Sequence, residues 1–166
     1  MQTHHAPLEV VALEAPEPHP QGSGRQWYAL FPAAWDAVPQ AVADLRERLM
    51  NLDGGEQALA STVLFGFSQG GAMALDCGCD LPLAGVISCS GYPHPEWEPD
   101  DNHPPVLIAH GSEDSVVPVQ ALDAIWSRLR PDRSEKLVFN QGHTIPSELM
   151  ETLQKTLHQM LPAEAS

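Results

Sequence analysis

The sequence predicts an α/β fold, with a mostly parallel sheet covered by helices on both faces, in a single domain over residues 1–166. Three observations support this prediction. Runs of strand length alternate with segments whose apolar residues recur at three- and four-residue spacing. The strand-length runs are apolar throughout, which is typical of strands buried on both faces. The chain has 166 residues and 43% apolar content, enough for one core and too few for two ordinary domains.

The N-terminal third predicts a strand, a long loop and a helix. Leu8–Leu13 (LEVVAL) is an apolar run of strand length, and the prolines that follow it end it. Residues 15–32 contain four prolines and two glycines and therefore predict a loop. Apolar residues then recur at helical spacing over 38–49, which predicts an amphipathic helix with Asp36 as its N-cap and an end near 51–55.

The rest of the chain alternates strands with helices. Three apolar runs predict buried strands, at 61–67, 83–89 and 105–109, and KLVF at 136–139 predicts a last strand. Three segments with helical spacing predict helices: 69–75, 119–129 and 146–161. On the last helix, Leu149, Met150 and Leu153 are expected to face the core. This order is typical of βαβ units, so we expect successive strands to lie parallel.

The charge of the chain is strongly negative. Asp and Glu number 22 against 8 Lys and Arg, which gives a net charge of −14. Such a field repels phosphate backbones and anionic membranes, so we expect neither nucleic acid nor a membrane as a partner. No apolar stretch approaches the ~20 residues that span a bilayer, and the N-terminus lacks the basic and apolar regions of a signal peptide. We therefore expect a cytoplasmic protein.

The cysteines and most of the histidines predict no chemistry. Cys77, Cys79 and Cys89 are expected to be reduced, structural thiols, because Cys-Gly-Cys is tighter than a redox pair and no second Cys/His cluster completes a zinc site. The acidic segment 97–103 (WEPDDNH) predicts a solvated loop without metal. Six histidines in loops, at the terminus or on a helix face are expected at the surface: His4, His5, His19, His94, His103 and His158.

One motif predicts a nucleophile. Residues 66–70, GFSQG, match G-x-S-x-G between a predicted strand and a predicted helix. A serine on such a sharp turn has a strained backbone and needs small neighbours, which Gly66, Gly70 and Gly71 supply. The turn presents Ser68 at the carboxyl edge of the sheet, where ligands bind in open α/β sheets. The alternative is an idle serine in a glycine-rich turn.

Two later loops offer the partners that a serine nucleophile needs. A base must take its proton and an acid must orient that base, and in G-x-S-x-G hydrolases the chain order is Ser, acid, His. Asp114 follows the strand at 105–109, and His143 follows the strand at 136–139, at spacings of 46 and 29 residues. Glu113 is the alternative acid. His110 is expected to brace the acid loop and is the alternative base.

Three segments together resemble the phospholipase/carboxylesterase family of α/β hydrolases, which includes acyl-protein thioesterases: GFSQGG, HGSEDSVVP and GHTIP before the last helix. Residues 12–30, ALEAPEPHPQGSGRQWYAL, also resemble a loop of this family. The resemblance implies an α/β-hydrolase fold with Ser68 as nucleophile, Asp114 as acid and His143 as base. It further implies that the Gln69 backbone N–H is one donor of the oxyanion hole, with no metal or organic cofactor.

The sequence departs from this family at one point. The family has a strand ending in H-G-x-G, before the segment that resembles LEVVALEAP, and its backbone supplies the second oxyanion donor. No H-G-x-G occurs upstream of Ser68. We therefore expect the first strands of the family fold to be missing and Met1 to be an internal methionine of a longer natural protein. The alternatives are that the two flanking strands close together or that a second chain fills the gap.

The sequence thus predicts a serine hydrolase that cleaves a small-molecule carboxylic ester or acyl-thioester through an acyl-enzyme, and it leaves a homodimer open. The resemblance places Arg25, Trp27 and Tyr28 near the site, either as walls of an acyl pocket or as a turn pinned to the core. Tyr92 is expected either to line the same pocket or to be structural. The alternative function is a catalytically impaired remnant of the fold that binds a ligand or partner without turnover.

Overall fold

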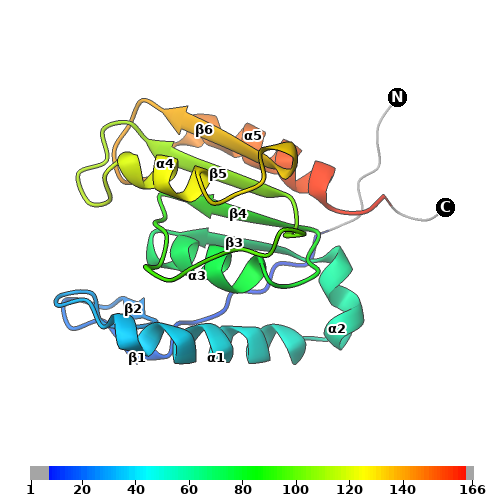
Figure 1. Ribbon diagram of the computed structural model, residues 1–166, viewed down its shortest axis with the longest axis horizontal. Helices are drawn as coiled ribbons and strands as arrows, with labels where there is room; N and C mark the ends of the chain where they lie inside the picture. The colour runs from blue at the N-terminus through cyan, green and yellow to red at the C-terminus, as the bar shows by residue number, and fades with distance from the viewer. Residues whose placement is uncertain (1–7, 164–166) are drawn as a thin grey trace.

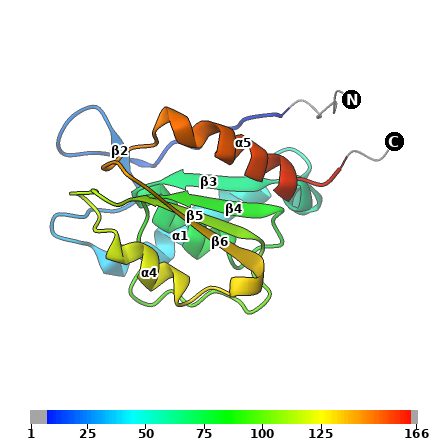
Figure 2. The same cartoon turned by 90° about the horizontal axis from the view of Figure 1, so that it is seen from above.

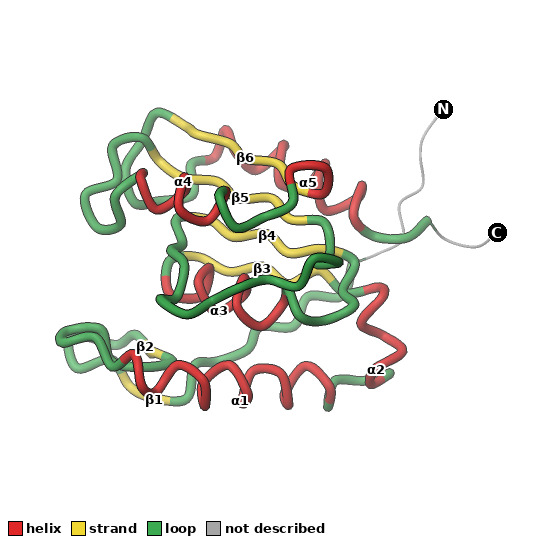
Figure 3. Tube along the Cα trace, in the orientation of Figure 1, coloured by secondary structure: helices red, strands yellow, loops and turns green. Residues whose placement is uncertain are grey.

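Four parallel strands form the centre of the computed structural model, which describes residues 8–163 (Figure 1). Their order is β3-β4-β5-β6, and every neighbouring pair is parallel. The bounds of the strands are β3 Val63–Phe67, β4 Gly85–Cys89, β5 Val106–Gly111 and β6 Ser134–Phe139. Figure 3 shows them as four yellow segments side by side. The prediction of a parallel α/β sheet is confirmed.

Helices cover both faces of this sheet. Their bounds are α1 Val38–Met50, α2 Gly55–Ala58, α3 Gln69–Gly78, α4 Gln120–Trp126 and α5 Ser147–Met160. Seen from above, α5 lies on one face, and α1 and α4 lie on the other (Figure 2). The four longer helices and the four strands of this sheet all correspond to predicted elements; the four-residue α2 was not predicted.

The core has two halves because alternate side chains of a strand face opposite sides of the sheet. Val86, Val106 and Ile108 pack against α1, α3 and α4 in the larger half. Ile87 and Leu107 pack against α5 in the smaller half, together with Leu149 and Leu153 of that helix. Met150 of α5 is 46% exposed, so its predicted place in the core is wrong.

The prediction of a strand at Leu8–Leu13 is wrong. Residues 8–13 take part in no strand ladder, and Val10 is 86% exposed. Among the described residues, β3 pairs with β4 alone and forms an edge of the sheet. Phe65 of β3 is accordingly 48% exposed, although the sequence predicts a buried strand there. An apolar run becomes a strand only where a partner strand lies beside it, and the sequence of the run does not specify that partner.

Two smaller predictions at the N-terminal side also need correction. The predicted loop 15–32 contains a short antiparallel pair, β1 (Glu17–Pro18) with β2 (Arg25–Gln26). Asp36 does not cap α1, because it lies inside a 3-10 turn and the N-cap residue is Ala37, with no side-chain cap. The helix starts instead directly from that turn, with a proline in its first turn.

The buried histidines are a further correction. His94 and His103 are 2% and 1% exposed, although the sequence predicts both at the surface. His103 uses Nδ1 on the Pro104 carbonyl and accepts the Arg130 N–H at Nε2, so its ring is satisfied inside the fold. Trp97 is also buried, so the segment 97–103 is not simply solvated. His19 and His158 are partly exposed, while His4 and His5 lie outside the described residues.

The described cysteines are all free and buried. Burial raises the pKa of the Cys77 thiol to about 12 and that of the Cys89 thiol to about 11, and it raises the pKa of Cys79 as well. Thiols that remain protonated are poor nucleophiles, which agrees with the predicted structural role. Within residues 8–163, no helix has the length and apolar character that a bilayer span requires.

Candidate active site

Ser68 stands on a sharp turn between β3 and α3. Its φ of 57° and ψ of −119° are strained for a residue with a side chain. The turn is held because the Ser68 N–H donates to the Cys89 carbonyl of β4 at 2.9 Å. A side chain at Gly66 would run into the Gly70 carbonyl, so only glycine allows the helix to start this close to the strand.

Three predicted residues meet at this turn. His143 Nε2 lies 3.1 Å from Ser68 Oγ, and His143 Nδ1 lies 2.7 Å from Asp114 Oδ2. Because the carboxylate can only accept, His143 Nδ1 carries the proton and donates to Asp114. Nε2 of the neutral ring then accepts from the Ser68 hydroxyl, which is the geometry that removes a proton from a serine.

Asp114 is held as a buried, ionised acceptor. Its side chain is fully buried, and Oδ1 accepts the Val116 N–H at 2.9 Å and the Val117 N–H at 2.7 Å. Burial raises the pKa of Asp114, but the hydrogen bonds from His143, Val117 and Val116 outweigh burial and bring the pKa below its ordinary value. The carboxylate therefore stays charged beside the imidazole.

The loops that carry Asp114 and His143 pack on one another. A side chain at Gly111 would meet the Gln141 and Gly142 carbonyls, so these two loops touch backbone to backbone. The Glu113 N–H donates to the Gln141 carbonyl at 3.0 Å. On the other side, the His143 ring stacks at 4.8 Å from the Phe67 ring. The position of the imidazole is thus set from both sides.

The alternative acid and base occupy other places. Glu113 is exposed, while its neighbour Asp114 takes the contact with His143. His110 is fully buried and donates from Nε2 to the Val117 carbonyl at 2.8 Å, 3.5 Å from Asp114 Oδ2. It therefore braces the acid loop, and His143 rather than His110 contacts Ser68.

Gln69 has a structural contact that the sequence analysis missed. Its backbone N–H belongs to the first residue of α3, directly after Ser68. Its side chain holds the segment before α1, because Oε1 accepts the Trp27 N–H at 2.7 Å and Nε2 donates to the Tyr28 carbonyl at 2.9 Å. No spacing in the sequence signals a contact over 42 positions. The helix start and this segment are thus tied together.

The aromatic candidates lie on that same segment and on the loop after β4. Tyr28 is buried, and its hydroxyl is 2.6 Å from both the Tyr92 hydroxyl and His94 Nε2, so it is pinned to the core. Trp27 is half-buried beneath the Arg48 guanidinium, which lies 5.2 Å from its ring. Arg25 is exposed and binds the Ala15 and Pro16 carbonyls, which makes it a loop clamp.

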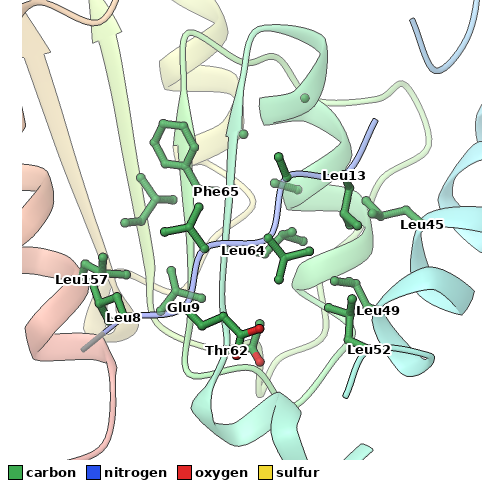
Figure 4. Close-up of a pocket in the computed structure, with 18 of the residues that line it drawn as sticks. Leu8, Glu9, Leu13, Leu45, Leu49, Leu52, Thr62, Leu64, Phe65 and Leu157 are labelled. Atoms are coloured by element: carbon green, nitrogen blue, oxygen red, sulfur yellow. The ribbon is translucent and has the colours of Figure 1, made fainter. Parts of the chain in front are cut away.

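A large apolar cavity lies beside β3. Its volume is about 1180 Å³, and its lining comes from the segment 8–13, β3, α1 and α5. Figure 4 shows Leu8, Leu13, Leu64 and Leu157 around it. Phe67 and Gly70 border it on both sides of Ser68, but Ser68 itself is not part of the lining. Within the described part of the chain, no three His, Cys, Asp or Glu side chains are grouped to hold a metal ion.

Known proteins of one family resemble this chain. The model of the Phospholipase/Carboxylesterase family matches residues 3–161. Acyl-protein thioesterase 1 of Emericella nidulans is 33% identical over 117 residues, 61% of this chain and 48% of that protein. The chain thus spans about half the length of the curated relatives it matches.

Two solved structures have the same architecture. The crystal structure of esterase PE8 superposes with a TM-score of 0.77 at 29% identity, over 89% of this chain and 76% of that one. The phospholipase/carboxylesterase from Dyadobacter fermentans superposes with a TM-score of 0.65 at 20% identity, over 81% and 70% of the two chains. The second likeness concerns the fold alone. The predicted α/β-hydrolase fold is confirmed.

Proposed function

The chain belongs to the phospholipase/carboxylesterase family, and we propose on this basis that it is a serine hydrolase of carboxylic esters or thioesters. The observation that carries the proposal is the continuous set of hydrogen bonds from Ser68 through His143 to Asp114. A serine hydroxyl is a weak nucleophile until a base takes its proton, and this array provides the base and its orienting acid.

In the proposed reaction, Ser68 Oγ attacks the substrate carbonyl while its proton passes to His143 Nε2. Asp114 holds the imidazole in this tautomer and stabilises the imidazolium that forms. His143 then returns the proton to the leaving alcohol or thiol, and an acyl-serine ester remains. Water, activated by the same imidazole, hydrolyses that ester and releases the acid with Ser68 restored.

The negative charge that develops on the carbonyl oxygen needs donors. We assign the Gln69 backbone N–H as one of them, because it lies at the first residue of α3, where the positive end of the helix dipole meets the site. Trp27 and Tyr92 are proposed to contact the substrate. Trp27 supports this role because it lines the apolar cavity and its N–H donates to Gln69 Oε1. Tyr92 supports it through the contact of its hydroxyl with Tyr28, the neighbour of Trp27.

The substrate is proposed to be a small-molecule ester or acyl-thioester. We also propose the cytoplasm as the compartment, because three free cysteines suit a reducing environment. The alternative function is a fold remnant that binds without turnover. It is favoured by one observation: residues 1–67 contain no H-G-x-G turn that could supply the second oxyanion donor.

A fluorophosphonate probe separates the two functions, because only an activated serine reacts with it. We expect labelling of the intact chain, its loss in Ser68→Ala and its persistence in Ser90→Ala. Ser90 is the matched control, since it is the other non-glycine residue among 8–163 with a positive φ, at 53°. An unlabelled native chain indicates the remnant. A panel of p-nitrophenyl esters and acyl-thioesters then defines the leaving group and acyl length.

A further inference from the structure

A second Asp–His–hydroxyl array lies in the protein, apart from Ser68. Asp76 of α3 contacts His94 Nδ1 at 2.6 Å, and His94 Nε2 contacts the Tyr28 hydroxyl at 2.6 Å. The Tyr28 hydroxyl in turn contacts the Tyr92 hydroxyl at 2.6 Å. We name these four residues the second array. It joins α3, the loop after β4 and the segment before α1, three parts that are distant in sequence.

The second array is not a second nucleophile site. Tyr28 and His94 are 1% and 2% exposed, so no substrate reaches the hydroxyl. Burial also raises the pKa of Tyr28 far above its ordinary value, and the phenol therefore stays protonated. A buried polar chain of this kind is satisfied only when every member keeps its partner, and it then holds the attached segments in one arrangement.

The hydrogen bonds of the second array run in one direction. Asp76 is a carboxylate and only accepts, so neutral His94 carries its proton on Nδ1 and donates to it. His94 Nε2 then accepts from Tyr28, and the Tyr28 oxygen accepts from Tyr92. Each hydroxyl thus donates to the member of the array that lies nearer Asp76.

Gln69 meets the array at Tyr28. Its Nε2 donates to the Tyr28 carbonyl at 2.9 Å. Its Oε1 accepts the Trp27 N–H at 2.7 Å, so both ends of the amide group are engaged. Because the array holds the Tyr28 hydroxyl and Gln69 binds the Tyr28 backbone, the position of Tyr28 sets the position of the Gln69 side chain.

We propose that the second array is a positioning network that locks the Gln69 side chain and thereby fixes its backbone N–H beside Ser68. The catalytic consequence rests on the proposed function, because it requires the Gln69 N–H to be an oxyanion donor. Such donors act only when they are aimed at the developing charge before the reaction begins, and a shift of ~1 Å is enough to weaken them. The network supplies this alignment through the side chain of Gln69, the first residue of α3.

Tyr92→Phe and Tyr28→Phe test the proposal, with His103→Gln as the matched control. His103 is as deeply buried as His94, but its partners are two backbone groups, the Pro104 carbonyl and the Arg130 N–H. Phenylalanine keeps the aromatic ring that Tyr92 is proposed to present to the substrate and removes only the hydroxyl. We therefore expect each tyrosine variant to lower kcat by about tenfold with KM changed less than about twofold, since the lost effect concerns the transition state. Affinity for an alkyl trifluoromethyl ketone, whose serine adduct carries the same oxyanion, should fall by the same factor.

His103→Gln is expected to lower the melting temperature and leave kcat and inhibitor affinity unchanged. Should Tyr28→Phe fail to fold, Tyr92→Phe at the half-buried end of the array decides the matter alone. Unchanged kcat and inhibitor affinity in a folded Tyr92→Phe variant overturn the proposal, as does an equal loss of kcat in His103→Gln.

A readout without turnover separates this proposal from the proposed function. The NMR signals of the Gln69 side-chain amide protons should exchange slowly in the native chain and rapidly in Tyr92→Phe. If the native chain hydrolyses nothing and this exchange still changes, the network stands and the hydrolase assignment fails. If the chain is active and the Gln69 signals are the same in both proteins, the network is overturned and the hydrolase assignment stands.

Discussion

His143 Nε2 lies 3.1 Å from Ser68 Oγ, although 75 positions separate the two residues in the chain. They also follow strands at opposite edges of the four-stranded sheet, because β3 precedes Ser68 and β6 precedes His143. Neighbouring strands are ~4.8 Å apart, so the two edges are separated by about 14 Å. The loop after β6 therefore reaches back across the carboxyl edge of the sheet, and its contacts with the acid loop hold it there.

Ser68→Ala and His143→Ala are each expected to remove most of the esterase activity, and the double variant should cost little more. The reason is that the proposed nucleophile and its proposed base would act as one unit, and losses within such a unit are not additive. Asp114→Asn should also lower kcat, by favouring the wrong tautomer of His143. Steady-state kinetics on a p-nitrophenyl ester measure all four variants, and losses that multiply would show that the residues do not act together.

The proposed activity is expected to fall on acidification, because a protonated imidazole cannot accept the Ser68 proton. Asp114 keeps its charge to a lower pH than an ordinary carboxyl, because its hydrogen bonds bring its pKa below the ordinary value. A pH profile of kcat between pH 4 and 9 checks this expectation. Full activity well below pH 5 would exclude a histidine base.

The lowered pKa of Asp114 also predicts that the stability of the fold depends on pH. Its carboxyl has a lower pKa in the folded state than in the unfolded chain, where the value is ~3.9. The stabilisation is complete above that value and is lost as the pH falls below it, because the unfolded state then binds more protons. Urea unfolding at pH 3 and pH 6 should show a smaller loss for Asp114→Asn than for the native chain.

The two outer glycines of the G-x-S-x-G motif should respond differently to alanine. A Cβ at Gly66 would run into the Gly70 carbonyl, whereas a Cβ at Gly70 has nothing within 4 Å. Gly66→Ala is therefore expected to abolish fluorophosphonate labelling and to lower the melting temperature by several degrees. Gly70→Ala, inside α3, should retain the fold and gain up to ~1 kcal/mol of stability from helix propensity. Equal melting temperatures for the two variants would contradict this account of the turn.

The cysteines are expected to resist thiol reagents until the chain unfolds. Burial raises the pKa of Cys77 to about 12 and that of Cys89 to about 11. Unfolded thiols ionise near pH ~8.5, so the folded state holds more protons above that pH. Their contribution to stability is complete below pH ~8.5 and is lost as the pH rises through the folded values. Thiol titration at pH 8, with and without denaturant, measures the resistance of the cysteines to thiol reagents. Rapid labelling of the native chain would contradict this prediction.

The outer edge of β3 should make the 166-residue chain poorly stable when it is expressed alone. Among the described residues that edge has no paired strand, and the apolar cavity of about 1180 Å³ lies beside it. An uncovered edge leaves apolar side chains such as Phe65, which is 48% exposed, in water. Burial of a large apolar side chain is worth ~1.5–3 kcal/mol, against a total stability of ~5–15 kcal/mol for a small domain. We expect an N-terminal extension with an H-G-x-G strand to raise both the melting temperature and the esterase activity.

A matched extension in which the two glycines are alanines should restore stability but not activity, because it supplies the strand without the second oxyanion donor. A cooperative melt of the 166-residue chain above ~60 °C, with full esterase activity, would contradict both expectations.

The sequence by itself determined the parallel sheet and the candidate residues Ser68, Asp114 and His143. Both depend on local signals. A continuous apolar run predicts a buried parallel strand wherever its partners lie, and the candidate catalytic loops are recognised by their order after successive strands. The chain order of Ser, Asp and His therefore pointed to one edge of the sheet without any knowledge of distances.

Only the tertiary structure decided which residues are buried and which segments find a partner. Leu8–Leu13 has the pattern of a strand and is not one, because a strand requires hydrogen bonds from a neighbour that its own sequence does not specify. His94 lies in a predicted loop, which favours a surface position. It is buried nevertheless, because Asp76, 18 positions earlier, and Tyr28, 66 positions earlier, satisfy both of its ring nitrogens. Contacts of this kind depend on three-dimensional proximity, which no local pattern encodes.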